Sequence, residues 1–203
     1  MKKNLRISIW MTLVTTILFG LVYPLVVTGL AQFLFPDRAN GQLIERDGKL
    51  VGSRIIGQPF VGAGYFHSRG SAAGNGYDAA NSAGTNLGPT NQKLIDRVKQ
   101  DVAALQAENP GKPIPADMVT TSGSGLDPHI SPANADFQVP RIARERGMSE
   151  EQLRQLIAQH TESRQLGFLG EPTVNVLELN LDLDAHFPMK RQAKAYDPQA
   201  ARF

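Results

Sequence analysis

The pattern of hydrophobic and polar positions divides the chain near residue 36. Residues 7–35 contain no Asp, Glu, Lys, Arg or His, and this run is longer than the roughly 20 residues that a helix needs to cross a bilayer. It predicts a transmembrane helix over 7–35 that tilts, or kinks at Pro24. A cleaved signal peptide is the alternative, with Gly29 and Ala31 before the cut. Signal peptides have apolar regions of only about 7 to 15 residues, and the apolar character here continues to Phe35, which favours a retained anchor.

Beyond residue 36 the first predicted element is a β-hairpin. Residues 43–46 and 49–51 are joined by Asp47-Gly48, a pair that accepts the positive φ of a two-residue hairpin turn. This register places Ile44 opposite Val51.

Glycine is frequent between residues 41 and 88, and the stretch has almost no periodic apolar pattern. A flexible linker is one interpretation. Aromatic side chains carry enough apolar area to hold loops against a core, and they favour an ordered, loop-rich region instead. These aromatic residues are Phe60, Tyr65, Phe66 and Tyr77.

Three helices are predicted in the second half of the chain. The first follows Asn91 and ends before Pro110, because apolar residues recur there at helical spacing. The second begins after the N-cap Ser131, and Pro140 is expected to break it and start another segment that runs to Gly147. The third begins at a capping box formed by Ser149 and Gln152. The apolar positions are Leu94, Ile95, Val98, Val102 and Leu105 in the first helix and Leu153, Leu156 and Ile157 in the third, whose stripe ends at His160.

The last apolar segment alternates with polar residues, which is typical of a half-buried strand. Its phase slips at Leu177, where a β-bulge is the simplest explanation. Asp182 and Asp184 then lie on the solvent face. The alternating positions are Val174, Val176, Leu179, Leu181 and Leu183.

These elements predict a single N-terminal transmembrane helix plus one α+β extracytoplasmic domain that is rich in loops. The expected organisation is a cytoplasmic N-terminus over 1–6, the transmembrane helix over 7–35, the domain over 36–188 and a polar basic tail over 189–203. The domain is long enough to bury about 70% of its unfolded surface.

Charge fixes the expected orientation. Lys2, Lys3 and Arg6 precede the apolar run, and every Asp and Glu lies at or beyond Asp37. The positive-inside rule therefore places the N-terminus in the cytoplasm and the domain outside. The remaining 18 basic and 19 acidic residues leave a net charge of −1, which gives no basic face for nucleic acid. The absence of cysteine is compatible with an oxidising compartment.

No motif predicts a catalytic centre. Ser124, Asp127 and His129 lie close together in sequence, but a nucleophile elbow needs Gly-x-Ser-x-Gly between strand and helix, and triad partners meet through the fold. Tight turns explain these residues better. The chain has no phosphate-binding Gly-rich motif, and its four histidines are scattered without an i, i+4 pair. We therefore expect no catalytic residues, no metal site and no cofactor of its own.

Six short motifs follow one another along the chain, at residues 57–60, 65–69, 86–91, 121–131, 138–141 and 167–170. Together they resemble one family, the C subunit of the bacterial high-affinity potassium-transporting P-type ATPase, or Kdp complex. The resemblance runs from the N-terminal helix to about Leu183.

The resemblance implies a non-catalytic accessory subunit in the bacterial inner membrane. Its partners are then a channel-like potassium-binding subunit and a P-type ATP-hydrolysing subunit, which handle potassium and ATP. The family role is that of a catalytic chaperone that raises the affinity of the pump for ATP. Because ATP is cytoplasmic and the domain is expected outside, such an effect would have to be relayed through the membrane helix and its neighbours.

Three segments, residues 65–69, 86–91 and 122–131, are the candidate partner contacts. We expect them to converge on one surface with Phe66 as an aromatic anchor. Internal bracing of the domain is the alternative use of the same motifs. An anchored serine hydrolase built on Ser124, or an anchored solute-binding or sensor module, is the alternative function. The candidate contact residues are Tyr65, Phe66, His67, Arg69, Asn86, Leu87, Gly88, Pro89, Thr90, Asn91, Ser122, Gly123, Ser124, Gly125, Asp127, Pro128 and His129.

Overall fold

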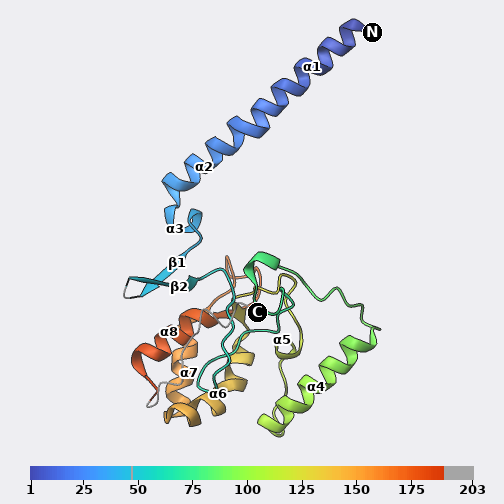
Figure 1. Ribbon diagram of the computed structural model, residues 1–203. Coiled ribbons are helices and arrows are strands. Elements are labelled where there is room, and N and C mark those ends of the chain that lie inside the picture. The colour runs from blue at the N-terminus through green and yellow to red at the C-terminus, as the bar shows by residue number, and fades with distance from the viewer. Residues whose placement is uncertain (47, 190–203) are drawn as a thin grey trace. The chain divides into compact units, whose positions relative to one another are not determined.

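The computed structural model describes residues 1–46 and 48–189. It divides the chain into two compact units, Met1–Ser53 and the part that begins at Arg54. Figure 1 shows the elements of both units. The predicted basic tail lies almost wholly outside the described residues.

The first unit begins with one continuous helical run from Lys2 to Leu34. It consists of α1 (Lys2–Ile17), a π-helical turn η1 (Leu18–Val22) and α2 (Tyr23–Leu34). Its length and composition suffice for a membrane span. No residue of these three segments is buried within the chain, so the apolar side chains are left for a lipid or protein environment.

The widened turn lies directly before Pro24. A proline removes one helical hydrogen bond, and its ring clashes with the carbonyl four residues earlier. In η1 the N–H of Tyr23 donates to the carbonyl of Leu18, five residues back. This π-type turn gives the helix room for the proline.

The first unit ends in the short helix α3 (Pro36–Ala39) and a hairpin of β1 (Leu43–Arg46) and β2 (Lys49–Ser53). The hairpin is confirmed, and Gly48 has the positive φ of +70° that the turn requires, whereas Asp47 lies outside the described residues. The predicted pairing of Ile44 with Val51 is wrong. Ile44 pairs with Gly52 and Glu45 with Leu50, so Val51 is the extra residue of a bulge.

The second unit is an α+β domain whose short strands make one antiparallel sheet in the order β3-β5-β4. The core lies between this sheet and α6, α7 and α8, while α4 lies to one side (Figure 1). In chain order the elements are η2 (Ala79–Asn81), α4 (Gln92–Glu108), α5 (Ala116–Val119), β3 (His129–Ile130), α6 (Pro132–Arg146), α7 (Glu150–Gln159), β4 (Thr161–Glu162), β5 (Thr173–Asn175) and α8 (Val176–His186).

The predicted starts of α4, α6 and α7 are confirmed. Asn91, Ser131 and Ser149 each accept a hydrogen bond from a backbone N–H of the first turn, and Ser149 forms the complete capping box with Gln152. None of the α4 residues is buried. The apolar stripe of α4 is therefore only partly covered by the domain.

The predicted break at Pro140 is wrong, because α6 runs through it from Pro132 to Arg146. An interior proline costs about 3 kcal/mol. The helix persists because Val139, Ile142 and Ala143 around it are buried in the core, and their burial outweighs that cost.

The predicted final strand is also wrong beyond residue 175. Only Thr173–Asn175 is a strand, and α8 begins at Val176 with Asn175 as its N-cap. Val176, Leu179 and Leu183 are buried together because they recur at three and four residues, which is the spacing of one helix face. The slip at Leu177 marks the start of a helix and not a bulge, and Asp182 and Asp184 are helix residues.

The glycine-rich segment is ordered, as predicted. Backbone N–H groups of Gly57 and Ala83 donate to the carbonyls of Leu126 and Ser124 at 2.8 and 3.0 Å. Gly125 has a φ of +70°, and a Cβ there would lie 2.7 Å from the backbone nitrogen of Ala73. Glycine therefore allows two loops to touch at this point.

Candidate functional site

Residues 65–69, the first predicted contact segment, run through the middle of the domain. Phe66 is fully buried in the core. Its N–H donates to the side-chain oxygen of Asn180, and its carbonyl accepts from the same amide, both at 2.9 Å. The expectation that Phe66 anchors a partner is therefore wrong, because the core of its own domain already covers the ring.

Gln138 repeats this arrangement one residue further along. Its side-chain oxygen accepts from the N–H of His67 at 2.8 Å, and its side-chain nitrogen donates to the His67 carbonyl at 3.1 Å. Asn180 and Gln138 are both about 1% exposed. Two buried amides thus satisfy the backbone of the segment as a neighbouring strand would.

Arg146 holds the start of the same segment. Its side chain is fully buried and donates to the carbonyl of Gly64 at 2.6 Å and to Asp184 at 2.8 Å. The guanidinium also lies 4.8 Å from the ring centre of Tyr65, whose hydroxyl donates to Asp184 at 3.0 Å. Burial, and then the Asp184 charge, raise the pKa of Tyr65. These contacts are structural, and they fit the bracing interpretation.

Residues 122–131, another predicted contact segment, lie against residues 65–69. Arg69 pairs with Asp127 at 3.0 Å, and the N–H of Ser122 donates to the carbonyl of Gly70 at 3.3 Å. The hydroxyl of Ser124 is used locally, where it accepts from the N–H of Leu126 at 3.1 Å.

No hydrolase triad is assembled in this loop. Asp127 accepts from Arg69 and from the backbone N–H of His129, and within the described residues no hydrogen bond joins Ser124 to His129. The nucleophile and base of a serine hydrolase must be within hydrogen-bond reach of one another. The structure does not favour the hydrolase interpretation.

Residues 86–91 form another predicted contact segment. Asn86 has a positive φ of +52°, and Asn91 caps α4 through the N–H of Lys93 at 2.9 Å. The ion pair of Arg69 and Asp127 thus joins residues 65–69 to residues 122–131. Within residues 54–189, no hydrogen bond or ion pair joins residues 86–91 to either of these two segments.

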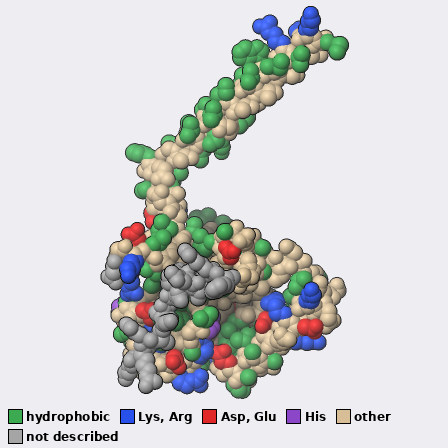
Figure 2. All heavy atoms as spheres, viewed as in Figure 1, with side chains coloured by type: hydrophobic (Ala, Val, Ile, Leu, Met, Phe, Trp, Pro, Cys, Tyr) green, Lys and Arg blue, Asp and Glu red, His purple; other side chains and the backbone are tan. Residues whose placement is uncertain are grey.

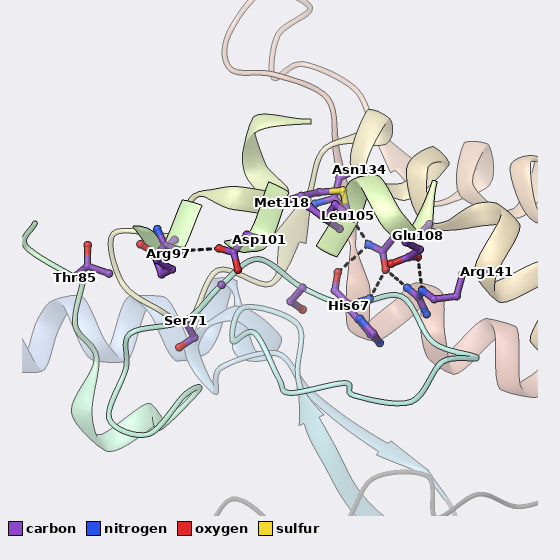
Figure 3. A pocket seen from close by; sticks show the side chains of 14 residues that line it. His67, Ser71, Thr85, Arg97, Asp101, Leu105, Glu108, Met118, Asn134 and Arg141 are labelled. Atoms are coloured by element: carbon purple, nitrogen blue, oxygen red, sulfur yellow. Dashed lines mark hydrogen bonds and ion pairs between the residues drawn. The ribbon is translucent and has the colours of Figure 1, made fainter. Parts of the chain in front are cut away.

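A pocket of about 440 Å³ lies between α4 and the rest of the domain, with its walls formed by α4, α6 and the loop that follows His67 (Figure 3). Figure 2 shows this region as a hollow beside α4. The volume is within the range of small-ligand sites. The pocket is lined by His67, Ser68, Gly70, Ser71, Thr85, Arg97, Asp101, Leu105, Glu108, Met118, Thr121, Asn134, Gln138 and Arg141.

Charged side chains in this pocket form two ion pairs, one within α4 and one between α4 and α6. Arg97 pairs with Asp101 at 3.3 Å within α4, and Arg141 of α6 pairs with Glu108 of α4 at 2.9 Å (Figure 3). Burial, and then the positive charge of Arg141, lower the pKa of His67. The two ion pairs therefore compensate the four charged Asp, Glu and Arg side chains that line the pocket.

Of the residues that line this pocket, only His67 is among the candidate contact residues predicted from the sequence. Arg97, Asp101 and Glu108 share one face of α4, but charges on a predicted helix are usually solvated. Three of the sequence motifs do contribute lining residues, with His67 and Ser68 in 65–69, Thr121 in 121–131, and Gln138 and Arg141 in 138–141. No group of three or more His, Asp or Glu side chains in the described ranges is placed to hold a metal ion.

Comparisons with known proteins agree with the sequence motifs. Residues 5–185 match the family described as KdpC: K+-transporting ATPase, c chain. The chain is 75% identical to the Potassium-transporting ATPase KdpC subunit of Koribacter versatilis, over 93% of this chain and 98% of that protein. It is 56% identical to the KdpC subunit of Rhodopseudomonas palustris, over 91% and 99% of the two chains. It is 60% identical to that of Caulobacter vibrioides, over 85% and 88%.

Proposed function

The chain belongs to the KdpC family of K+-transporting ATPase c chains, and from this premise we propose that it is a non-catalytic subunit that assembles with two larger membrane subunits. One partner is a channel-like subunit that binds potassium, and the other is the P-type subunit that hydrolyses ATP. The complex imports potassium into the bacterium. The chain has no cofactor of its own in this proposal.

The proposed topology is a single pass through the inner membrane with the N-terminus in the cytoplasm. It is supported by Lys2, Lys3 and Arg6 before the apolar helical run and by the acidic residues confined to the part beyond it. The domain that begins at Arg54 is then extracytoplasmic. There it can contact only the outer surfaces of the larger subunits.

We further propose that the chain raises the affinity of the complex for ATP without contacting ATP. A domain outside the membrane cannot reach a cytoplasmic nucleotide, so the effect is a coupling free energy carried by the membrane helix and its neighbours. Coupling of this kind amounts to about 1–3 kcal/mol, or 5- to 150-fold in affinity.

The observation that carries the proposal is the family match, which covers both the apolar helix and the domain. The arrangement around Ser124 is consistent with it, because within the described residues the Ser124 hydroxyl accepts from the N–H of Leu126 and makes no hydrogen bond to His129. Neither observation favours the hydrolase or the solute-binding module as a second function.

Purification from a membrane tests the proposal. The full chain, carrying an affinity tag and expressed with the two larger subunits, is expected to retain both in detergent, and the purified chain alone is expected to hydrolyse no ATP. Complexes prepared without this chain should need 5- to 150-fold more ATP for half-maximal hydrolysis. ATP turnover by the isolated chain, or failure to retain either subunit, contradicts the proposal.

A further inference from the structure

The connection between β4 and β5 displays apolar side chains on a fixed tip. We use the name hairpin tip for residues 164–171, which include the sequence motif over 167–170. Leu166, Phe168 and Leu169 are 82%, 69% and 47% exposed. In the domain from Arg54 to Met189, the other strongly exposed large apolar residues are Ile55 and Val61, so three of the five belong to this tip. Exposed apolar side chains that gather in this way mark interaction sites.

Backbone hydrogen bonds define the shape of the hairpin tip. Gln165 and Leu169 exchange two bonds, each at 2.9 Å, and the N–H of Gly167 donates to the carbonyl of Arg164 at 3.1 Å. At the base of the tip Arg164 pairs with Glu171 at 2.6 Å. The tip is therefore a closed turn with a charged rim.

Leu166 carries a strained backbone in this turn. Its φ of +53° lies in the left-handed region, which is unfavourable for a bulky residue other than glycine. Strain of this kind persists where a particular shape has a use. Here the strained residue is also the most exposed of the three, so core packing does not explain it.

These features distinguish the possible occupants. A bilayer is fluid and accepts an apolar loop of any shape, so insertion into lipid would not require a strained turn. A second copy of the chain would need about 800 Å² per partner, which is more than three side chains supply. A small rigid tip suffices when its partner is already held nearby, because tethering makes the contact intramolecular. The apolar helix from Lys2 to Leu34 provides that tether for a partner in the same membrane.

We propose that the hairpin tip inserts Phe168 and Leu166 into an apolar pocket on one of the larger membrane subunits. The pair of Arg164 and Glu171 forms the polar rim of this contact. Such a rim excludes water from the hot-spot residues at the centre of an interface. This inference rests on the proposed function, since it names a contact within the same complex. It replaces Phe66, which is buried, with Phe168 as the aromatic anchor.

Retention of the full chain by the complex is the first test. Phe168→Ser and Leu166→Gly are compared with Val61→Ser, a matched control because Val61 is apolar and 88% exposed outside the tip. The two tip variants should lose at least about tenfold in affinity for the larger subunits, and the control should bind as the wild type does. Leu166→Gly relieves the strained φ, so its melting temperature should stay the same or rise while assembly weakens.

Opposite effects on folding and assembly exclude misfolding as the cause of a loss. Tip variants that are retained like the wild type overturn the inference and leave the proposed function intact. If the wild-type chain itself is not retained, the proposed function fails instead.

Thiol protection identifies the occupant. The chain has no cysteine, so Phe168→Cys introduces a single thiol, and Val61→Cys supplies the exposed reference. In lipid nanodiscs that hold the chain alone, a soluble maleimide should modify both thiols at similar rates. With the two larger subunits present, the thiol from Phe168→Cys should react at least about tenfold more slowly. Protection in lipid alone shows that the bilayer is the occupant, and equal reactivity in the complex shows that the tip is free. Either result overturns the inference.

Discussion

Two buried amides decide the role of Phe66. Asn180 and Gln138 bond both backbone groups of Phe66 and of His67, so the segment is fixed within the domain before any partner arrives. An aromatic ring next to glycine-rich motifs resembles a docking anchor in the sequence. The amides that hold it come from α6 and α8, more than 70 residues away.

Phe66→Ala should destabilise the chain by about 3–5 kcal/mol, because truncation of a fully buried aromatic side chain leaves a cavity. Urea unfolding of the full chain in detergent measures this. Phe168→Ala is the matched control and should change the free energy of unfolding by no more than about 0.5 kcal/mol, since Phe168 is 69% exposed. Equal losses in the two variants would contradict the assignment of Phe66 to the core.

The position of His67 predicts that the free energy of unfolding of the domain depends on pH. Burial, and then Arg141, lower the pKa of His67 in the fold, so the unfolded chain binds the proton more readily. The free energy of unfolding should therefore fall as the pH drops below about 6.5, the ordinary value for histidine. His67→Gln should flatten this dependence below about pH 6.5. An equal pH dependence in the wild type and in His67→Gln would contradict this role of His67.

At the scale of elements, burial determines which periodic pattern is realised. Residues 173–183 combine a stretch of alternation with helical spacing, and the strand takes only the first three of them. Asn175 ends the strand and caps α8, and its side chain also donates to the carbonyl of Arg54 at 2.8 Å. One residue thus joins the sheet, the helix and the start of the domain.

Asn175→Ala should cost about 2 kcal/mol, of which about 1 is the helix cap and about 1 is the bond to Arg54. Ser149→Ala removes the cap of α7 and should cost only about 1 kcal/mol. Thermal unfolding of the two variants under the same conditions gives the comparison. A smaller loss for Asn175→Ala than for Ser149→Ala would show that the switch from strand to helix does not depend on this side chain.

For the whole molecule, the sequence predicts that the two ends of the apolar helix lie on opposite sides of the membrane. Cysteine scanning is direct because the chain has no cysteine. In intact spheroplasts, a membrane-impermeant maleimide should modify Val61→Cys and should not modify Lys3→Cys, whereas permeabilised cells should show both modified. The reverse pattern would contradict the positive-inside orientation.

Local chemistry explains what the sequence determined by itself. The apolar run, the caps at Asn91, Ser131 and Ser149, and the hairpin around Gly48 depend on neighbours within a few residues, so their pattern is visible in the chain. The family motifs are also contiguous, and they identified the family correctly.

Tertiary structure decided the outcome wherever two local patterns compete or distant residues meet. Pro140 remains inside a helix, and the segment after Asn175 becomes a helix, because the core gains more from burying their apolar neighbours than the local preference costs. Phe66 is buried, whereas Phe168 is exposed. Exposure depends on which distant side chains cover a residue, and no property of a short segment contains that information.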